Sequence, residues 1–336
     1  MTKPWEEQDD ESLKQVLKQA KRRTWIRNIS ISLIVSIAAV ILIQFGALQL
    51  TYRASDHALR EEILYRSMTS PNEYEGGYRD QRGFLSGTLE LSTYKIVEGV
   101  PVPWGSYWTD YKVPGFLKLS GTGGRSGIQV TDSEMQREDY KYNRSYNAAN
   151  GQRELMFYIP GVDYNGKIIK DLNRLANLPS PKVAELAISF DMDYSLAEVQ
   201  SMLPQGVRPV WYWVDTYDNR ETFHFKPYKD ETGGTSYPLP MTKIYNVYGF
   251  GIHPDSGRVD AEDFVRNVEY GLEAKGRYYK EYERIYNYLK KDKDAPDESD
   301  VRLLGVVVTG TPQQLERLQG QPYVRAAVLG AVADKY

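Results

Sequence analysis

The sequence predicts an α+β protein attached to a single transmembrane helix. An uncharged, apolar stretch runs from Asn28 to Tyr52, which is long enough to cross a bilayer. Residues 84–100 alternate apolar and polar side chains, as half-buried strands do. Residues 177–336 hold two strand-helix-strand patterns with an inserted long helix, and this arrangement predicts a ferredoxin-like sheet.

The uncharged stretch has the length of a membrane span rather than of a cleaved signal. The 25 residues from Asn28 to Tyr52, at roughly 1.5 Å each, reach about 37 Å, against the roughly 30 Å of a hydrocarbon layer. A signal peptide has a shorter apolar region and a small-residue cleavage site, whereas TYRASDHALREE follows here. We therefore expect a single-pass protein of the cell membrane. The excess of Lys and Arg before the span places the N-terminus in the cytoplasm and the rest outside.

The composition excludes several kinds of site. The 336 residues include no cysteine, which rules out disulfides, zinc sites with thiolate ligands and cysteine nucleophiles. The net charge of -3 offers no general attraction for nucleic acid, so no direct nucleic-acid partner is expected. An exported region without disulfides suits the envelope of a Gram-positive bacterium.

The first 28 residues predict a short amphipathic helix. Acidic residues come first and basic residues last, the order that a helix dipole favours. Four apolar residues follow i, i+3, i+4, i+7 spacing, and three lysines lie beside them: Leu13, Val16, Leu17, Ala20, Lys14, Lys18 and Lys21. A helix this short needs a partner in water. Two partners remain open, namely anionic lipid headgroups of the bilayer and a cytoplasmic protein with a groove for these side chains.

Residues 52–176 predict a helical stalk followed by a β-rich domain. The expected elements are a stalk at 53–70, a loop at 72–82, strands at 84–100 that end at Pro101 and Pro103, and strands at 113–120 and 154–161. The glycine-rich segment 121–127 lacks the lysine that ends a phosphate-binding loop, so it predicts a turn.

Residues 177–336 predict the ferredoxin-like α+β domain. Its expected strands lie at 183–190, 208–217, 301–310 and 322–330, with a further strand or hairpin at 243–252. Ser195 with Glu198, and Thr311 with Gln314, have the spacing of capping boxes at helix starts, and Pro312 suits a first helical position. A single long helix is expected from Ala261 to Lys291, with a charged linker after it.

The search for a catalytic or metal site gives weak candidates. His57, His224 and His253 are too far apart in sequence for a metal motif. Asp191 and Asp193 form a D-x-D pair that could hold a metal or act as acid and base, but aspartates at such turns more often bond to the backbone. No nucleophile motif occurs. We therefore expect no enzymatic activity, no catalytic residue, no cofactor and no metal.

Two tryptophans could mark a binding surface. Trp211 and Trp213 share one face of a predicted strand, and Tyr212 lies on the other. They could form an exposed platform, but packing in the core is the favoured interpretation.

Four segments together resemble one bacterial family. They are WIRNISISLIVSI, VAELAISFDMDYSLAEVQSMLP, WYWVDTY and VRLLGVVVTGTPQQL. In this combination they resemble the Bacillus-type membrane-bound regulators of extracytoplasmic-function sigma factors. The resemblance covers the N-terminal region with the span and the region from about Pro181 onward.

This resemblance implies an anti-sigma factor for the stress response of the cell envelope. Such a protein sequesters an extracytoplasmic-function sigma factor at the membrane until an envelope signal releases it, and the seven residues of the N-terminal stripe become the expected sigma-factor-binding site. Because about 28 residues precede the span, a second small membrane protein could assist. The expected domains are 1–28 in the cytoplasm, 29–51 in the membrane, and 52–176 and 177–336 outside. The alternatives are a structural or assembly protein of the envelope, whose N-terminus is only an anchor, and an exported enzyme acting on wall polymer.

Overall fold

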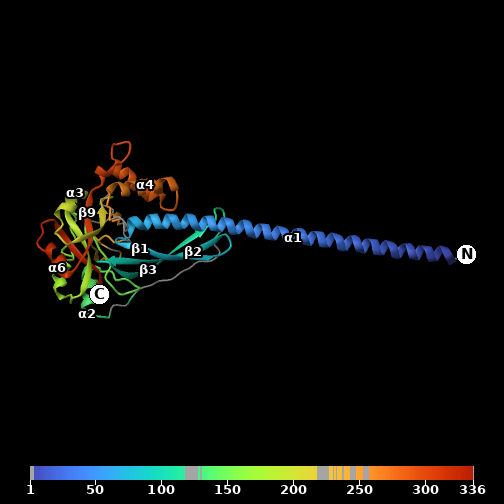
Figure 1. Ribbon diagram of the computed structural model, residues 1–336, viewed down its shortest axis with the longest axis horizontal. Coiled ribbons are helices and arrows are strands. Elements are labelled where there is room, and N and C mark those ends of the chain that lie inside the picture. Colours follow the sequence, from blue (N-terminus) through green and yellow to red (C-terminus); the bar gives the residue numbers. More distant parts are fainter. Residues whose placement is uncertain are drawn as a thin grey trace. The chain divides into compact units, whose positions relative to one another are not determined.

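The computed structural model describes residues 4–117, 128, 131–217, 227–229, 231, 233–236, 238–242, 247–252 and 257–335. The chain divides into two units (Figure 1). The first contains residues 1–56, 82–87 and 111–119, and the second contains residues 57–81, 88–110 and 120–336.

Helix α1 (Pro4–Thr69) is the longest element of the described chain. It runs without a break through the predicted amphipathic segment, the predicted span and the predicted stalk. Its most apolar window has a mean hydropathy of 2.5 and is only 6% buried, so α1 is long and apolar enough to cross a membrane. Within the first unit, Ala47 of α1 packs with Leu85 and Val113.

A three-stranded sheet follows α1. Its strands are β1 (Glu73–Arg82), β2 (Ser86–Val97) and β3 (Val100–Lys112), in the order β1-β2-β3. Glu98 and Gly99 connect β2 to β3, and both have positive φ angles, of 51° and 85°, as a two-residue hairpin turn requires. The strand predicted at 84–100 is thus confirmed as β2.

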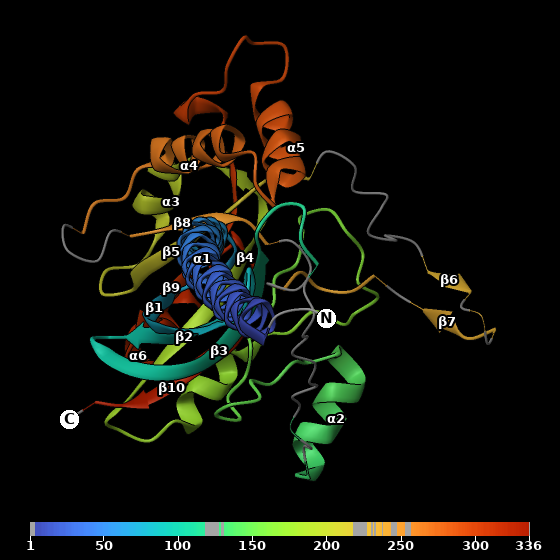
Figure 2. The same ribbon diagram turned by 90° about the vertical axis from the view of Figure 1, so that its right-hand side faces the viewer.

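The second sheet has five strands in the order β10-β4-β9-β5-β8. They are β4 (Lys182–Tyr194), β5 (Arg208–Val214), β8 (Gly249–Gly251), β9 (Leu303–Gly310) and β10 (Val324–Asp334), and every neighbouring pair is antiparallel. The two predicted strand-helix-strand segments are present as β4-α3-β5 and β9-α6-β10. Their strands alternate in the sheet, so β9 separates β4 from β5. A separate hairpin of β6 (Tyr228–Lys229) and β7 (Thr235–Ser236) lies apart from this sheet (Figure 2).

Short helices connect the strands. The α-helices are α2 (Ser133–Tyr142), α3 (Leu196–Met202), α4 (Ala261–Ala274), α5 (Tyr279–Lys290) and α6 (Pro312–Leu315), and the 3-10 helices are η1 (Asp171–Asn177), η4 (Glu298–Asp300) and η5 (Glu316–Leu318). Both predicted capping boxes are confirmed. The backbone N–H of Ser195 donates to Glu198 at 2.7 Å, and that of Thr311 donates to Gln314 at 2.8 Å. Each box satisfies backbone donors that a helix start leaves unpaired.

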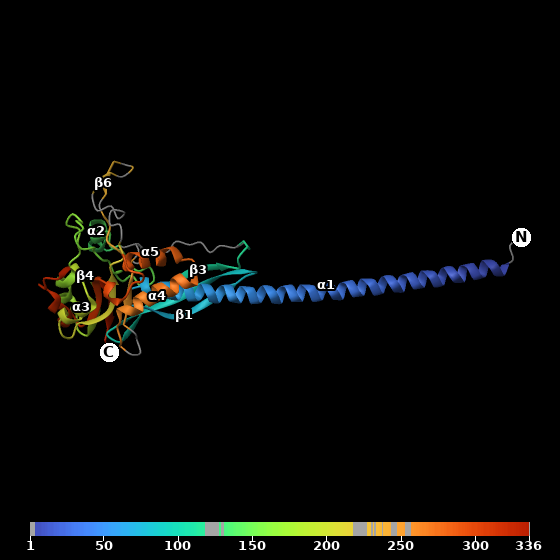
Figure 3. The same cartoon turned by 90° about the horizontal axis from the view of Figure 1, so that it is seen from above.

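Both faces of the five-stranded sheet are covered. One face packs against α3, α4, α5, α6 and η5, of which α4 and α5 lie side by side (Figure 3). The other face packs against the segment 155–169 and carries Trp211 and Trp213. Both tryptophans are buried, so the prediction of core packing is confirmed. Burial on two faces explains why the β9 sequence is almost continuously apolar rather than alternating.

The prediction of one helix from Ala261 to Lys291 is wrong. Lys275 adopts a left-handed conformation with φ of 49° and ends α4, and α5 begins at Tyr279. Gly276 lies in the turn, where a Cβ atom would be 1.0 Å from the Glu61 Oε1 atom of α1. The turn passes directly over the Glu61 carboxylate, so position 276 has no room for a side chain.

Several predictions for residues 72–161 also need correction. The expected loop at 72–82 is the edge strand β1, whose charged and exposed side chains suit a sheet edge. Pro101 and Pro103 lie inside β3 and do not end the pairing. Strand β3 is the edge of the three-stranded sheet opposite β1, and prolines are tolerated at an edge because the N–H groups they lack would not be needed for pairing.

Two further segments are not strands. Residues 113–117 of the strand predicted at 113–120 form a turn, and residues 118–120 lie outside the described residues. Residues 154–161 contain one isolated bridge, between Phe157 and Met241. Leu155 to Ile159 are nevertheless fully buried, since they cover a sheet face instead of joining its edge. The turn predicted at 121–127 and residues 243–246 of the predicted hairpin lie outside the described residues.

A buried carboxylate joins the two sheets. Glu185 of β4 has no exposed surface, and its Oε2 atom lies 2.8 Å from the Nζ atom of Lys95 in β2. Asn72 donates to its Oε1 atom at 2.7 Å, and the backbone N–H of Ala331 in β10 donates to Oε2 at 3.2 Å. A β-bulge between Leu329 and Val332 turns this N–H away from the strand ladder.

We predict that Lys95→Met lowers the free energy of unfolding by about 3–5 kcal/mol, because it leaves the Glu185 charge buried without its cation. Adding Glu185→Gln should restore part of the loss, because it removes the unpaired buried charge, while its single amide oxygen can accept from either Asn72 or Ala331 but not from both. Chemical denaturation of the full chain in detergent measures both variants. A Lys95→Met variant as stable as the wild type, or a double variant no more stable than the single one, would contradict this role of the Lys95–Glu185 pair.

Candidate functional site

The predicted sigma-factor-binding residues all lie on α1, in the first unit. Leu13, Val16, Leu17 and Ala20 are exposed and follow the spacing that brings them onto one helix face. Lys14, Lys18 and Lys21 are exposed on the same stretch. The helix therefore has a continuous, exposed apolar stripe with lysine side chains beside it.

A second candidate site lies in the second unit, where the last turns of α1 meet α5. We call it the tyrosine clamp, and it consists of Tyr65, Tyr248, Tyr278 and Tyr282. The rings of Tyr65 and Tyr278 stack with their centroids 3.7 Å apart and their planes within 4°. Tyr248 and Tyr282 meet the Tyr65 ring edge-on, at 6.4 and 6.5 Å. Stacked and edge-on pairs of this kind each add about 0.5–1.5 kcal/mol beyond the area they bury.

Two carboxylates of α1 extend the clamp. Glu62 is buried, accepts from the Tyr278 hydroxyl at 2.7 Å and pairs with Arg66 at 2.6 Å. Glu61 accepts from the backbone N–H of Arg277 at 3.2 Å, in the turn between α4 and α5. The end of α1 is thus bonded to a segment more than 200 residues further along the chain, through side chains on two successive positions.

The α4–α5 turn is held from other directions as well. The Arg277 guanidinium donates to the Thr109 hydroxyl and to the Asp110 carbonyl of β3. On α5, Glu281 accepts from the Tyr248 hydroxyl at 2.8 Å and pairs with Arg284 at 3.1 Å. The turn therefore connects α1, the three-stranded sheet and the five-stranded sheet.

Burial sets the ionisation of the clamp. Removal from water raises the pKa of Tyr65, Tyr248, Tyr278 and Tyr282 above the ordinary value of about 10, and nearby carboxylates raise it further. The four hydroxyls therefore stay neutral at physiological pH. Those of Tyr248 and Tyr278 donate to Glu281 and Glu62, whereas the buried Tyr282 hydroxyl has no hydrogen-bond partner. An arrangement of neutral, bonded rings is suited to fixing α1 in one position rather than to acid–base chemistry.

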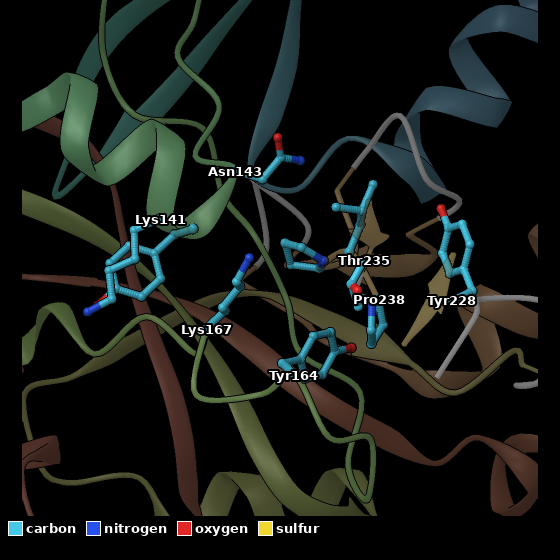
Figure 4. A pocket seen from close by; sticks show the side chains of 10 residues that line it. Lys141, Asn143, Tyr164, Lys167, Tyr228, Thr235 and Pro238 are labelled. Atoms are coloured by element: carbon cyan, nitrogen blue, oxygen red, sulfur yellow. The ribbon is translucent and has the colours of Figure 1, made fainter. Parts of the chain in front are cut away.

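The second unit also contains a cavity of about 290 Å³, near the lower end of the usual range for ligand pockets (Figure 4). It lies between the end of α2, the turn at Tyr164 and Lys167, and the chain around the β6–β7 hairpin. Lys141 and Lys167 line it together with three tyrosines, and none of its ten described lining residues is acidic. Its chemistry suits a negatively charged ligand.

The other candidates from the sequence are explained by structural contacts. Asp191 accepts from the Tyr194 hydroxyl at 2.8 Å, and Asp193 pairs with Arg302 at 2.6 Å. His57 lies 3.5 Å from Glu61 on α1, whereas His224 and His253 fall outside the described residues. Within the described part of the chain, no group of three or more His, Asp or Glu side chains could hold a metal ion.

Sequence reasoning missed the clamp and the cavity. It placed residues 261–291 on a single long helix, and it did not find the stack of Tyr65 on Tyr278. The pair Lys275–Gly276 was the available signal, since glycine inside a helical pattern often marks a helix end. No local pattern could have paired residues this far apart.

Comparison with known families identifies the family to which this chain belongs. The model of the sigma factor regulator N-terminal region matches residues 14–102, and that of the sigma factor regulator C-terminal region matches residues 175–331. No curated protein and no solved structure matches. The chain belongs to the sigma factor regulators, a regulatory rather than a catalytic family, and its partner is a sigma factor. Lys95 lies in the first matched region and Glu185 in the second, so the buried pair joins the two.

We predict that the chain loses stability above about pH 10. The unfolded tyrosines ionise near that pH while the buried ones keep their protons, so the folded state binds more protons and the free energy of unfolding falls as pH rises, by up to about 1.4 kcal/mol per group and pH unit. Denaturation between pH 8 and about pH 11 measures the slope. Tyr282→Phe removes one such group and should lose less stability over this range. An equal slope in the variant would show that these hydroxyls do not determine the alkaline limit.

Proposed function

We propose that this chain is a membrane-anchored anti-sigma factor. In this proposal, residues 29–51 cross the cell membrane, the N-terminal part of α1 sequesters an extracytoplasmic-function sigma factor in the cytoplasm, and residues 52–336 respond to the state of the envelope. The observation that carries it is the match to both regions of the sigma factor regulators on a chain whose α1 is long and apolar enough to span a bilayer.

The flanking charges support the proposed orientation. Six Lys and Arg residues precede the apolar stretch, from Lys14 to Arg27, while Arg53 and Arg60 follow closely after it. Such an excess favours the cytoplasmic side for the N-terminus. The residues proposed to bind the sigma factor then lie just inside the membrane, where they could also contact a second small membrane protein.

The stripe on α1 supports helix-in-groove recognition. Leu13, Val16 and Leu17 are large, apolar and exposed, as anchors for a groove must be, and the lysines beside them suit an acidic rim on the partner. Because α1 is continuous from Pro4 to Thr69, we propose that a change at the tyrosine clamp reaches the stripe by displacing or rotating one helix.

The strand order supports a ferredoxin-like core for the C-terminal region. With β4, β5, β9 and β10 taken as strands one to four, the sheet order becomes four, one, three, two, and the two crossover helices lie on one face. We propose this topology for the region, with β8 as an added edge strand and α4 and α5 as an insertion between the two halves.

We predict that Leu13→Asp combined with Leu17→Asp weakens sigma-factor binding by about 100-fold or more, because two apolar anchors are replaced by charges that the groove cannot solvate. The matched control is Gln15→Asp with Gln19→Asp, which adds the same two charges off the stripe. The full chain is purified in mild detergent, the co-purifying sigma factor is identified by mass spectrometry, and transcription from its promoters is measured in the same cells.

The stripe variant should release the sigma factor and raise transcription, while the control should retain both properties of the wild type. Unchanged binding by the stripe variant would remove these residues from the site. Absence of any change in transcription after deletion of the whole chain would overturn the proposed function itself.

A further inference from the structure

The first unit contains an apolar surface that the proposed function does not use. We call it the sheet tip, and it comprises residues 82–87, at the turn between β1 and β2, and residues 111–117, at the end of β3. Both segments are rich in apolar side chains and contain two cations, Arg82 and Lys112, but no Asp or Glu.

The largest apolar side chains of the tip face outward. Phe84 is 61% exposed, Phe116 is 47% exposed and Leu117 is 78% exposed. Three large apolar groups left in water on neighbouring turns would cost stability and invite aggregation, which indicates that something covers them.

The tip is fixed to α1 near the end of its apolar stretch. Leu85 and Val113 of the tip pack against Ala47, and the Arg82 guanidinium lies 3.8 Å from the centre of the Tyr52 ring. The backbone of the tip is bonded internally, since Val113 donates to the Leu85 carbonyl at 2.8 Å. The N–H groups of Gly83 and Phe116 also donate within the tip, to the Ser86 and Val113 carbonyls, so several of its polar backbone groups are satisfied without water, which favours a place near lipid.

These contacts determine how deep the tip lies. A hydrocarbon layer of roughly 30 Å takes about 20 helical residues, so a centred stretch from Asn28 to Tyr52 leaves that layer at about residue 50. Ala47 then lies roughly 4 Å below its edge. A tip that packs against Ala47 cannot remain in bulk water while α1 spans the bilayer.

We propose that the sheet tip inserts into the headgroup region of the bilayer, with Phe84, Phe116 and Leu117 in contact with the acyl boundary and Arg82 and Lys112 at the phosphates. Aromatic and cationic side chains gather at this depth of a membrane, and lipid is the occupant that the continuity with the span favours. This inference rests on the proposed membrane anchor. The tip and the span together would then hold the first unit in the bilayer at two points.

The chain contains no cysteine, so a fluorophore attached to one introduced cysteine reports the membrane depth of that position alone. Phe116→Cys, Leu42→Cys in the span and Tyr270→Cys on an exposed part of α4 are each labelled with an environment-sensitive fluorophore. The full-length variants are reconstituted into vesicles of phosphatidylcholine and phosphatidylglycerol. Quenching by doxyl-labelled lipid reports contact with acyl chains, and quenching by aqueous iodide reports contact with water.

The label at position 116 should be quenched several-fold more by doxyl lipid, and several-fold less by iodide, than the label at position 270. The label at position 42 should respond to doxyl lipid alone. If position 42 lies in lipid while position 116 is as open to iodide as position 270, the tip proposal fails and the anchor stands. If positions 42 and 116 are both open to iodide, the anchor itself fails.

Discussion

Two sheets from distant parts of the chain meet at one buried carboxylate, and the surrounding structure is arranged to hold it. Moving Glu185 out of water is costly unless its oxygens are fully bonded, and Lys95, Asn72 and the Ala331 backbone together provide those bonds. Gly330 is required beside it, because a Cβ atom there would lie 2.5 Å from the Glu185 Oε2 atom. The bulge in β10 presents the Ala331 N–H to this carboxylate, β2 provides Lys95, and Asn72 lies just after the end of α1.

The buried Lys95–Glu185 pair connects the two regions of a sigma factor regulator. Lys95 belongs to the sheet that follows α1, and Glu185 belongs to the central part of the five-stranded sheet. The tyrosine clamp adds a second connection, from α1 to the α4–α5 turn. Under the proposed function, these two connections would carry a change in the five-stranded sheet to the end of α1.

Local patterns predicted most of the C-terminal elements. Ser195 and Thr311 were recognisable as caps because their partners lie three residues away, and the apolar runs of β4 and β9 were recognisable because both sheet faces are covered. The N-terminal stripe was predicted for the same reason, since helical spacing is local. Its exposure agrees with the prediction, while its role remains a proposal.

Features that depend on distant contacts were not predictable. Gly276 could have marked a helix end, but nothing near it in the sequence indicates that the turn contacts Glu61 of α1. The segment around Phe157 has the composition of a strand, but it covers one face of the five-stranded sheet instead of pairing at its edge. The strand β1 has the composition of a loop, and it becomes a strand through pairing with β2.

Photocrosslinking from position 17 in living cells tests whether the N-terminal part of α1 binds a sigma factor. A photoreactive amino acid replaces Leu17, with Leu42 in the span as the reference position, and the crosslinked products are identified by mass spectrometry. We expect a crosslink to a sigma factor as the main product from position 17 and no such crosslink from position 42. The crosslink to the sigma factor should be lost when the envelope is stressed. Crosslinks from position 17 to lipid alone, or to no sigma factor under any condition, would contradict it.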